Sequence, residues 1–494
     1  MEILLRAKLP FLIWFSVITS TLCVMAQPAF VAPSTSTNDV VLLSAEGKVQ
    51  VAHAGSAQWD PASTNLVLQL GDRLRTGLRS RAVVRFSNLS VVRVNELTTF
   101  LIQPPSVAGK PSKLDLEKGS TYFLSRERPS DVEFNTPLSS GAIRGTEFHL
   151  FVAENGRTVV TLVDGALSLS NNMGSADLMS GEEAAVEPGQ GPVKTAGINA
   201  ANIIQWCLYY PGVLNLDEAG LNGMEQQELA ASLANYRQGD LLKAMAEYPA
   251  GRVPQSDAEK IYLAALLLSV GQVEQSEALL DSVSKESPLR HALLELVAAV
   301  KFQTGTLPAD PNTSTGWLAE SYYLQSRSRL DEALVSARKS VVKSPAFGFG
   351  WARVAELEFG FGRIAAARDA LEKSLTLSPR NAEAASLQGF LFAAQNQFSA
   401  ARRQFDAAIA LDAALGNAWL GRGLVRIHSG ESEGGRRDLQ VAATLEPQRA
   451  LLRSYLGKAF GNAADNKHAR KELDLARKLD AGDPTAWLYA ALLD

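Results

Sequence analysis

The spacing of apolar residues changes once along this chain, at a linker near residues 188–195. Between Val40 and Leu169, short apolar or alternating runs are separated by glycines, a pattern typical of β-strands joined by turns. Beyond about residue 223, the apolar positions instead follow the period of amphipathic helices. The pattern predicts a multidomain α+β chain, with an all-β domain first and an all-α region after it.

The helical half repeats with a step of about 34 residues. Its units end at Pro345, Pro379, Ala413, Pro447 and Ala481. When the units are aligned, one position near the start of each unit, which we call the tryptophan column, holds Trp317, Trp351, Ala385, Trp419, Arg453 and Trp487. A second aligned position holds small residues: Ala355, Gly389, Gly423 and Gly457. Each unit resembles the tetratricopeptide repeat. The resemblance implies stacked helix pairs that form an extended binding surface.

Composition shifts and the repeat step together divide the chain. The expected parts are a signal peptide (1–26), a flexible tether (27–39), the β domain (40–195), a linker or joint (196–222) and the repeat array (223–494). Within the array we expect units at about 223–254, 257–288, 314–347, 348–381, 382–415, 416–449 and 450–483, a degenerate unit at 291–313 and a partial one at 484–494.

The N-terminus has the features of an export signal. Arg6 and Lys8 precede an apolar run from Leu9 to Val24, and the small residues before Gln27 suit signal-peptidase cleavage. The run is short and contains serines and threonines, so a cleaved signal is favoured over a retained anchor. Cleavage would leave Cys207 as a lone cysteine, without an internal disulfide or a cysteine metal cluster.

Several motifs of the β domain occur in an order that matches a known family. They are GDRLRTG, RAVVRFSN, LEKGSTYFLSRE, TPLSSGAIRGTEF, VTLVDGALSLS and the turn at Gly181. This segment resembles the FecR family of periplasmic β domains, which implies an extracytoplasmic sensing or interaction module. Signalling members carry a cytoplasmic helical domain before a membrane span. Only a few residues precede the apolar run in this sequence, so we expect no cytoplasmic part that would hold a sigma factor.

Candidate catalytic chemistry is sparse. The five histidines show no paired spacing, and the loop that begins at Asp310 lacks the Gly and Glu of a calcium site. No phosphate-binding or nucleophile motif occurs, and a net charge of −4 argues against a general nucleic-acid binder. We therefore predict no enzyme activity, no cofactor, no metal and no small-molecule substrate.

Arginines form two patterns. In the β domain, Arg73, Arg75, Arg79, Arg81, Arg85 and Arg93 occupy odd positions and would share one strand face. This face could attract an anionic ligand, but a solvated outer face is favoured. In the array, Arg368, Arg402, Arg436 and Arg470 recur at the repeat step, and we expect ion pairs four residues on, to Glu372, Asp406 and Asp474.

The inner groove of the array is the expected partner site, because first helices line the concave face in this repeat family. The positions transferred to this chain are Tyr322, Gln325, Phe349, Glu356, Phe390, Asn417, Leu424, His428, Lys458 and Asn462. The surface is mixed and rather apolar, which favours an extended peptide or a helix of another protein. Some of these side chains could instead be core between repeats.

Together these features predict an exported, non-catalytic scaffold of the bacterial envelope that binds protein or peptide partners. Its expected location is the periplasm or cell envelope, reached through the Sec pathway, with outer-membrane association left open. The alternative is an envelope sensor or signal relay, in which the β domain detects a ligand or receptor state. The apolar segment 486–493 also suggests that further repeats, or another chain, cover this end.

Overall fold

The structure is a computed structural model that describes residues 40–78, 80–87, 90–103, 113–125, 132–180, 182–195, 212–301, 311–447 and 449–493. The expected signal peptide and tether lie outside these ranges, as do Asp310 and residues 196–211 of the expected joint, which include the aromatic residues Trp206, Tyr209 and Tyr210. The order of a strand-rich domain and a helical array confirms the predicted fold class.

The N-terminal domain contains short strands, as the alternating pattern predicts. They are β1 (Val40–Glu46), β2 (Val49–Ala52), β3 (Asp60–Pro61), β4 (Val67–Leu68), β5 (Arg73–Thr76), β6 (Arg81–Ser87), β7 (Ser90–Val94), β8 (Thr99–Gln103), β9 (Lys113–Ser125), β10 (Val132–Asn135), β11 (Ser140–Val152), β12 (Thr158–Asn171), β13 (Gly174–Met179), β14 (Glu183–Val186) and β15 (Val193–Thr195). The main path of neighbours runs β15-β14-β12-β11-β10-β9-β7-β6-β1-β4.

One face of this sheet encloses the β-domain core. Leu42 on β1 and Val186 on β14, near opposite ends of the strand order, belong to the same buried cluster, so the sheet curls over itself. In β6, Ala82, Val84 and Phe86 point into this cluster. The alternate residues of β6, β7, β9 and β11 therefore lie on the opposite face.

The helical part runs from α3 to α19. Its helices are α3 (Gly223–Glu228), α4 (Ala230–Gln238), α5 (Leu241–Ala246), α6 (Asp257–Ser269), α7 (Val273–Asp281), α8 (Pro288–Val300), α9 (Ser314–Ser326), α10 (Leu330–Lys343), α11 (Gly348–Gly360), α12 (Ile364–Leu377), α13 (Ala382–Ala394), α14 (Phe398–Leu411), α15 (Gly416–His428), α16 (Ser432–Leu445), α17 (Ala450–Asn462), α18 (Asn466–Leu479) and α19 (Pro484–Ala491). From α9 onward, first and second helices each begin at intervals of 34 residues.

Side chains of the tryptophan column join several repeats to the one before. The indole Nε1 of Trp351 donates a hydrogen bond to the carbonyl oxygen of Pro345 at 2.8 Å, and Trp419 donates in the same way to Ala413 at 2.7 Å. Arg453, in a slot of this column, donates from Nε to the Pro447 carbonyl at 3.2 Å. The arginine thus keeps the repeat-to-repeat bond that tryptophan makes elsewhere.

The turns between paired helices also repeat. Ser328, Gly362, Asn396, Gly430 and Ala464 stand 34 residues apart, and each has a positive φ between 59° and 86°. This left-handed conformation reverses the chain within a short turn and brings each second helix back along the first.

The first part of the helical region folds back on the later repeats. Glu218 accepts hydrogen bonds from the backbone nitrogens of Ser314 (2.6 Å) and Thr315 (3.0 Å) at the start of α9. Farther along, Arg380 donates from Nε to Asp240 at 2.8 Å. Gly239 allows this approach, because a Cβ there would lie 2.8 Å from the Asn381 backbone nitrogen. Residues 212–246 therefore cover the edge of the array where α9, α11 and α13 begin.

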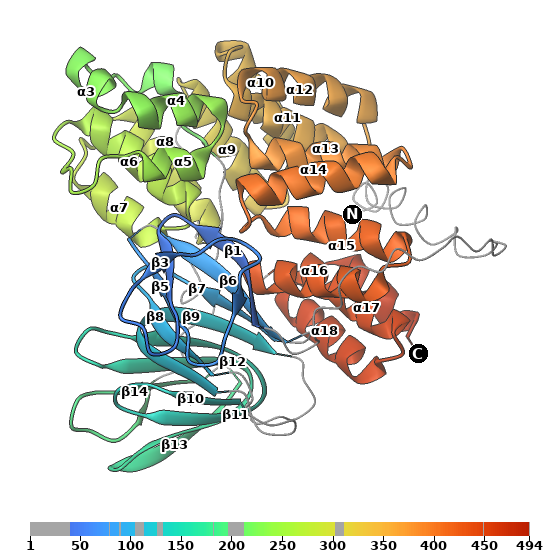
Figure 1. Ribbon diagram of the computed structural model, residues 1–494. Helices are drawn as coiled ribbons and strands as arrows, with labels where there is room; N and C mark the ends of the chain where they lie inside the picture. The colour runs from blue at the N-terminus through green and yellow to red at the C-terminus, as the bar shows by residue number, and fades with distance from the viewer. Residues whose placement is uncertain are drawn as a thin grey trace.

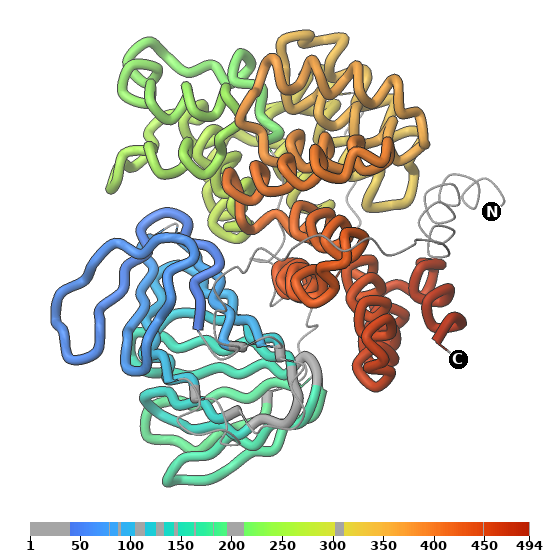
Figure 2. Tube along the Cα trace, turned by 45° about the vertical axis from the view of Figure 1, so that its right-hand side comes forward, coloured from blue at the N-terminus to red at the C-terminus, as the bar shows by residue number. Residues whose placement is uncertain are grey.

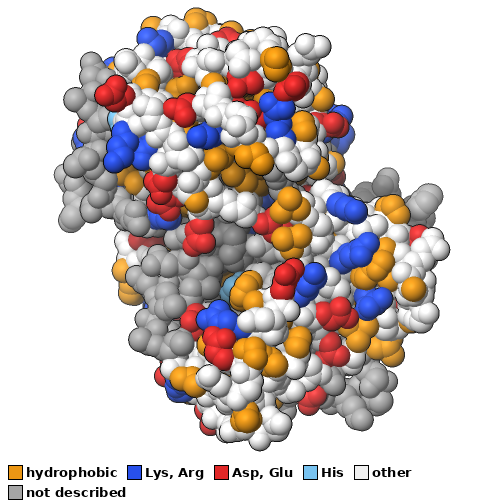
Figure 3. Space-filling model, turned by 90° about the vertical axis from the view of Figure 1, so that its left-hand side faces the viewer, with side chains coloured by type: hydrophobic (Ala, Val, Ile, Leu, Met, Phe, Trp, Pro, Cys, Tyr) orange, Lys and Arg blue, Asp and Glu red, His pale blue; other side chains and the backbone are white. Residues whose placement is uncertain are grey.

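The array forms an arc, and both its early helices and its late repeats border the β domain (Figures 1 and 2). Gln275 on α7 donates to Glu96 of the β domain at 3.1 Å, while α16 packs on β7 and β9. Acidic and basic side chains are interspersed on the face shown in Figure 3. The helical region thus meets the β domain at two separate places.

Candidate interaction surfaces

Three apolar side chains on neighbouring first helices make up what we call the apolar strip: Phe390 of α13, and Leu424 and Ile427 of α15. All three are half-buried and pack against the same core cluster. Phe390 also packs edge-on against Phe405, with ring centroids 4.9 Å apart. Two of the predicted groove residues, Phe390 and Leu424, therefore lie together and keep part of their surface open to solvent.

The predicted residues of α9 and α11 surround a buried arginine. The guanidinium of Arg353 lies 4.1 Å from the ring centroid of Tyr322 and pairs with Glu356 at 2.7 Å. It also donates to the hydroxyl and carbonyl oxygens of Ser321. Gln325 and Glu356 are exposed, whereas Tyr322 is half-buried. This set is polar and internally paired, so it offers less open apolar surface than the apolar strip.

Phe349 does not line the predicted groove. Its side chain is buried in the apolar cluster formed mainly by residues 213–300. Its ring lies 5.4 Å from that of Tyr236, and Gly212 packs directly on it. The register of Phe349 places it at the start of α11, on the edge that residues 212–246 cover. The transferred position was wrong here because the chain before the regular repeats returns to this edge.

The remaining predicted residues lie on α15 and α17. Asn417 accepts a hydrogen bond from Arg449 at 2.8 Å, and the exposed His428 has its ring 3.9 Å from that of Phe398. Lys458 is half-buried, with its ammonium 4.8 Å from the Tyr489 ring centroid, and burial lowers its pKa. Asn462 is exposed and lines a pocket.

That pocket lies where α15, α16 and α17 meet. It has a volume of about 280 Å³ and is lined by Ile427, Ser432, Glu433, Arg436, Ala459, Asn462 and Ala463. Because Ile427 belongs to both, the pocket continues from the end of the apolar strip. A second pocket, at the junction of the β domain with α5–α7, has a volume of only about 30 Å³, room for little more than water.

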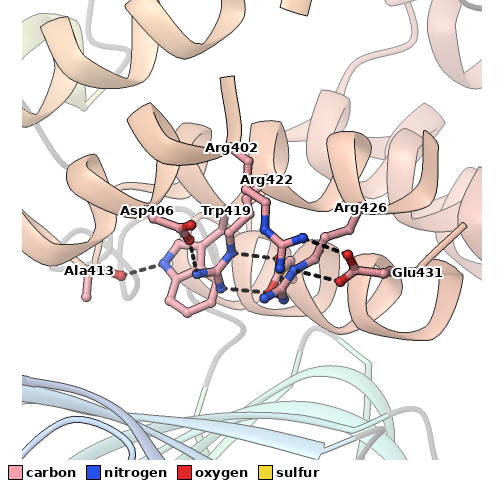
Figure 4. Close-up of polar contacts among 8 residues, drawn as sticks. Arg402, Asp406, Ala413, Trp419, Arg422, Arg426 and Glu431 are labelled. Atoms are coloured by element: carbon pink, nitrogen blue, oxygen red, sulfur yellow. Dashed lines mark hydrogen bonds and ion pairs between the residues drawn. The ribbon is translucent and has the colours of Figure 1, made fainter. Parts of the chain in front are cut away.

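Two arginines of the array, Arg402 and Arg422, pair with acidic residues that lie outside their own helices. Arg402 donates to Glu431 at 2.6 Å, and Arg422 bridges Asp406 (3.0 Å) and Asp438 (2.8 Å) (Figure 4). Asp406 was expected to pair with Arg402, so that expectation was wrong. Glu431, in the turn of the next repeat, lies within reach of Arg402 and pairs with it instead.

The second face of the β sheet docks on the array. Val83, Val91, Tyr122 and Leu124 share one apolar cluster with residues of α15–α17 such as Leu439 and Leu456. Two arginines of the odd-position pattern, Arg81 and Arg93, are buried at this joint. The expectation that this face is solvated is therefore wrong for the part of the sheet that meets the array.

Buried charges link the two domains at three points. Arg453 of α17 pairs with Glu147 of β11 and, at 3.3 Å, with Glu472 of α18, and Tyr122 donates to Glu147. Burial alone would lower the pKa of Arg453, but the two carboxylates outweigh it and raise that pKa. Arg453 and both glutamates are at most 2 % exposed, so the joint depends on their mutual neutralisation.

The other two points involve the arginines of the β domain. Arg81 pairs with Glu46 in its own domain and donates to Asp412, before α15, at 3.2 Å. Arg93 donates to the carbonyl oxygen of Leu445 at 2.9 Å, which is the C-terminal end of α16 and favours a cation. The sequence signal for this joint was Arg453, which interrupts the tryptophan column.

Neither a metal centre nor a membrane-spanning helix is found in the described part of the chain. Among these residues, no group of three His, Cys, Asp or Glu side chains is arranged to hold a metal ion. No helix within the described ranges combines the length and hydropathy that a membrane span requires.

Residues 72–168 match the model of the family described as FecR protein. A curated relative, anaphase-promoting complex subunit 3 of Schizosaccharomyces pombe, is 28% identical over 110 residues, which are 22% of this chain and 16% of that protein. The chain thus spans about a sixth of the length of that relative.

Solved structures with similar folds include a thermophilic TPR protein from Thermus thermophilus (18% identity, TM-score 0.33, covering 37% of this chain and 99% of that one). A putative anti-sigma factor from Parabacteroides distasonis also matches (16% identity, TM-score 0.25, covering 28% and 68%). Scores of this size carry no functional argument. The family match and the observed repeats show that this chain joins a FecR domain to a tetratricopeptide repeat array.

Proposed function

We propose that this protein is an exported, non-catalytic scaffold of the bacterial cell envelope, in which the repeat array binds a protein or peptide partner. The observation that carries the proposal is the apolar strip of Phe390, Leu424 and Ile427. It keeps open surface, whereas the edge where the helix pairs begin is covered by residues 212–246 and by the β domain. Apolar surface on a repeat protein is the usual place for partner binding.

Site-specific photo-crosslinking in the native cell tests the proposal. A photoreactive amino acid at His428, which is exposed beside the apolar strip, should give adducts with envelope proteins. The matched control is Val342, which is 78% exposed on second helix α10 and should give few or none. Equal adduct yields at both positions, or recovery of the protein only from the cytoplasm, would contradict the proposal.

The buried joint supports a second candidate function, a sensor that relays a state of the FecR domain to the array. The Arg453–Glu147 pair and the Arg81–Asp412 pair couple the two domains directly. A relay predicts that breaking Arg453–Glu147 changes the crosslinking yield at His428. A pure scaffold predicts the same yield with the joint intact or broken.

A further inference from the structure

The pocket between α15, α16 and α17 contains an arginine without a counter-ion. Arg436 makes no ion pair or hydrogen bond within the part of the chain that the structure describes, and its Nε is shielded from solvent. The centre of its guanidinium lies 5.6 Å from the ring centroid of the buried Phe460. A half-buried cation without a carboxylate is costly, so this site favours an anion from outside.

The repeat itself explains why Arg436 is unpaired. One repeat earlier, Arg402 pairs with Glu431, the residue before α16, and the side chain of Glu431 does not cap that helix. The equivalent residue for Arg436 is Asp465, which caps α18 by accepting a hydrogen bond from the His468 backbone at 3.4 Å. It also bonds the His468 ring at 2.7 Å. The acid that would neutralise Arg436 is therefore engaged elsewhere.

The rest of the lining suits a carboxylate attached to a short hydrocarbon chain. Asn462 and Ser432 provide exposed polar side chains, while Ile427, Ala459 and Ala463 provide apolar walls. The volume of about 280 Å³ is far above the 10–15 Å³ or so that one water needs. Glu433 also borders the pocket, but it has an interaction of its own.

We propose that this pocket binds the carboxylate of an acidic side chain in a partner peptide, with Arg436 as its counter-ion, while apolar residues of the same peptide lie on the apolar strip. The guanidinium can hold a carboxylate through two parallel hydrogen bonds. The shared residue Ile427 joins the pocket to the strip, so one short segment reaches both. This inference rests on the proposed function, since it names the chemistry of the partner that the array binds.

A selection with phage-displayed random heptapeptides on the purified full-length chain tests the proposal. Selected peptides should combine apolar residues with Asp or Glu at one position. The same selection on Arg436→Gln should keep the apolar preference and lose the acidic one. Arg402→Gln is the matched control, because that arginine already has Glu431, and it should change neither preference.

One selected peptide then enters a double-mutant cycle by fluorescence anisotropy. Replacing its acidic residue by the amide should weaken binding about tenfold, as expected for a charged hydrogen bond, and should have little further effect on Arg436→Gln. Asp465→Glu should also weaken the acidic peptide, because the longer side chain can reach Arg436.

The outcomes separate the two proposals. Peptides that bind with no acidic preference, or whose acidic preference survives Arg436→Gln, would overturn the carboxylate site while leaving the scaffold function standing. If no peptide is enriched on the wild-type chain while a photoreactive residue at His428 still gives adducts, the carboxylate site alone fails. If no peptide is enriched and His428 gives no adducts, both proposals are overturned.

Discussion

Replacing Arg453 by tryptophan would isolate the contribution of the joint between the domains. Tryptophan at this column can still donate to the Pro447 carbonyl, as Trp351 and Trp419 do to their equivalents. The substitution therefore keeps the bond between repeats and removes only the cation that faces Glu147 and Glu472. Both carboxylates are fully buried, so they lose the Arg453 cation without gaining access to water.

The expected loss is about 3–5 kcal/mol, the cost of removing one partner from a buried ion pair. At about 1.4 kcal/mol per factor of ten, the local opening equilibrium should rise by roughly two to four orders of magnitude. Native-state hydrogen exchange read by mass spectrometry measures this opening segment by segment. Exchange should accelerate in β9, β11 and α17 and stay unchanged in α11.

Two further variants serve as controls. Glu147→Gln in the Arg453→Trp background should recover part of the loss, because it removes one of the two buried charges that Arg453 faced. Arg402→Gln breaks a pair in which both side chains are at least 38% exposed, and should cost under about 1 kcal/mol. If Arg453→Trp accelerates exchange no more than Arg402→Gln, or accelerates it equally in every helix, the reasoning about the joint is refuted.

Three other predictions concern buried titratable groups and export. Burial lowers the pKa of His149 to about 4, below its unfolded value near 6.5. The contribution of the neutral ring to folding stability is therefore complete above pH 6.5 and is lost as the pH falls through 4. His149→Gln should reduce the acid-induced fall in Tm between these pH values. Burial and the nearby Glu320 raise the pKa of Glu295 to about 8, so stability is complete below about 4.5 and is lost as pH rises through 8. Glu295→Gln should therefore become more stable than wild type at alkaline pH, by up to about 5 kcal/mol in urea titrations, and a difference that does not change with pH would contradict this assignment. Mass spectrometry of the exported protein should find a mature N-terminus at or near Gln27, and a chain that keeps Leu9 to Val24 would contradict cleavage.

The sequence by itself determined the order of the domains and the register of the repeats. Strand and helix periods are local properties, because they depend on which face of an element each side chain occupies. The 34-residue step therefore places the first helices, the second helices and the turn residues such as Gly362 and Gly430 where the structure has them. The motifs of the β domain likewise identified the FecR family without any structural information.

The tertiary structure alone decided which charged side chains form ion pairs between the two domains and which positions of the array are covered. Arg453 and Glu147 are 306 residues apart, and Arg81 and Asp412 are 331 apart. Each pair joins a residue of the β domain, outside the repeats, to a residue of the array, so only the docking of the sheet on α15–α17 brings the charges together. The same holds for Arg436 and Phe349: the first is left unpaired because Asp465 caps a helix, and the second is buried because residues 212–246 return to its edge.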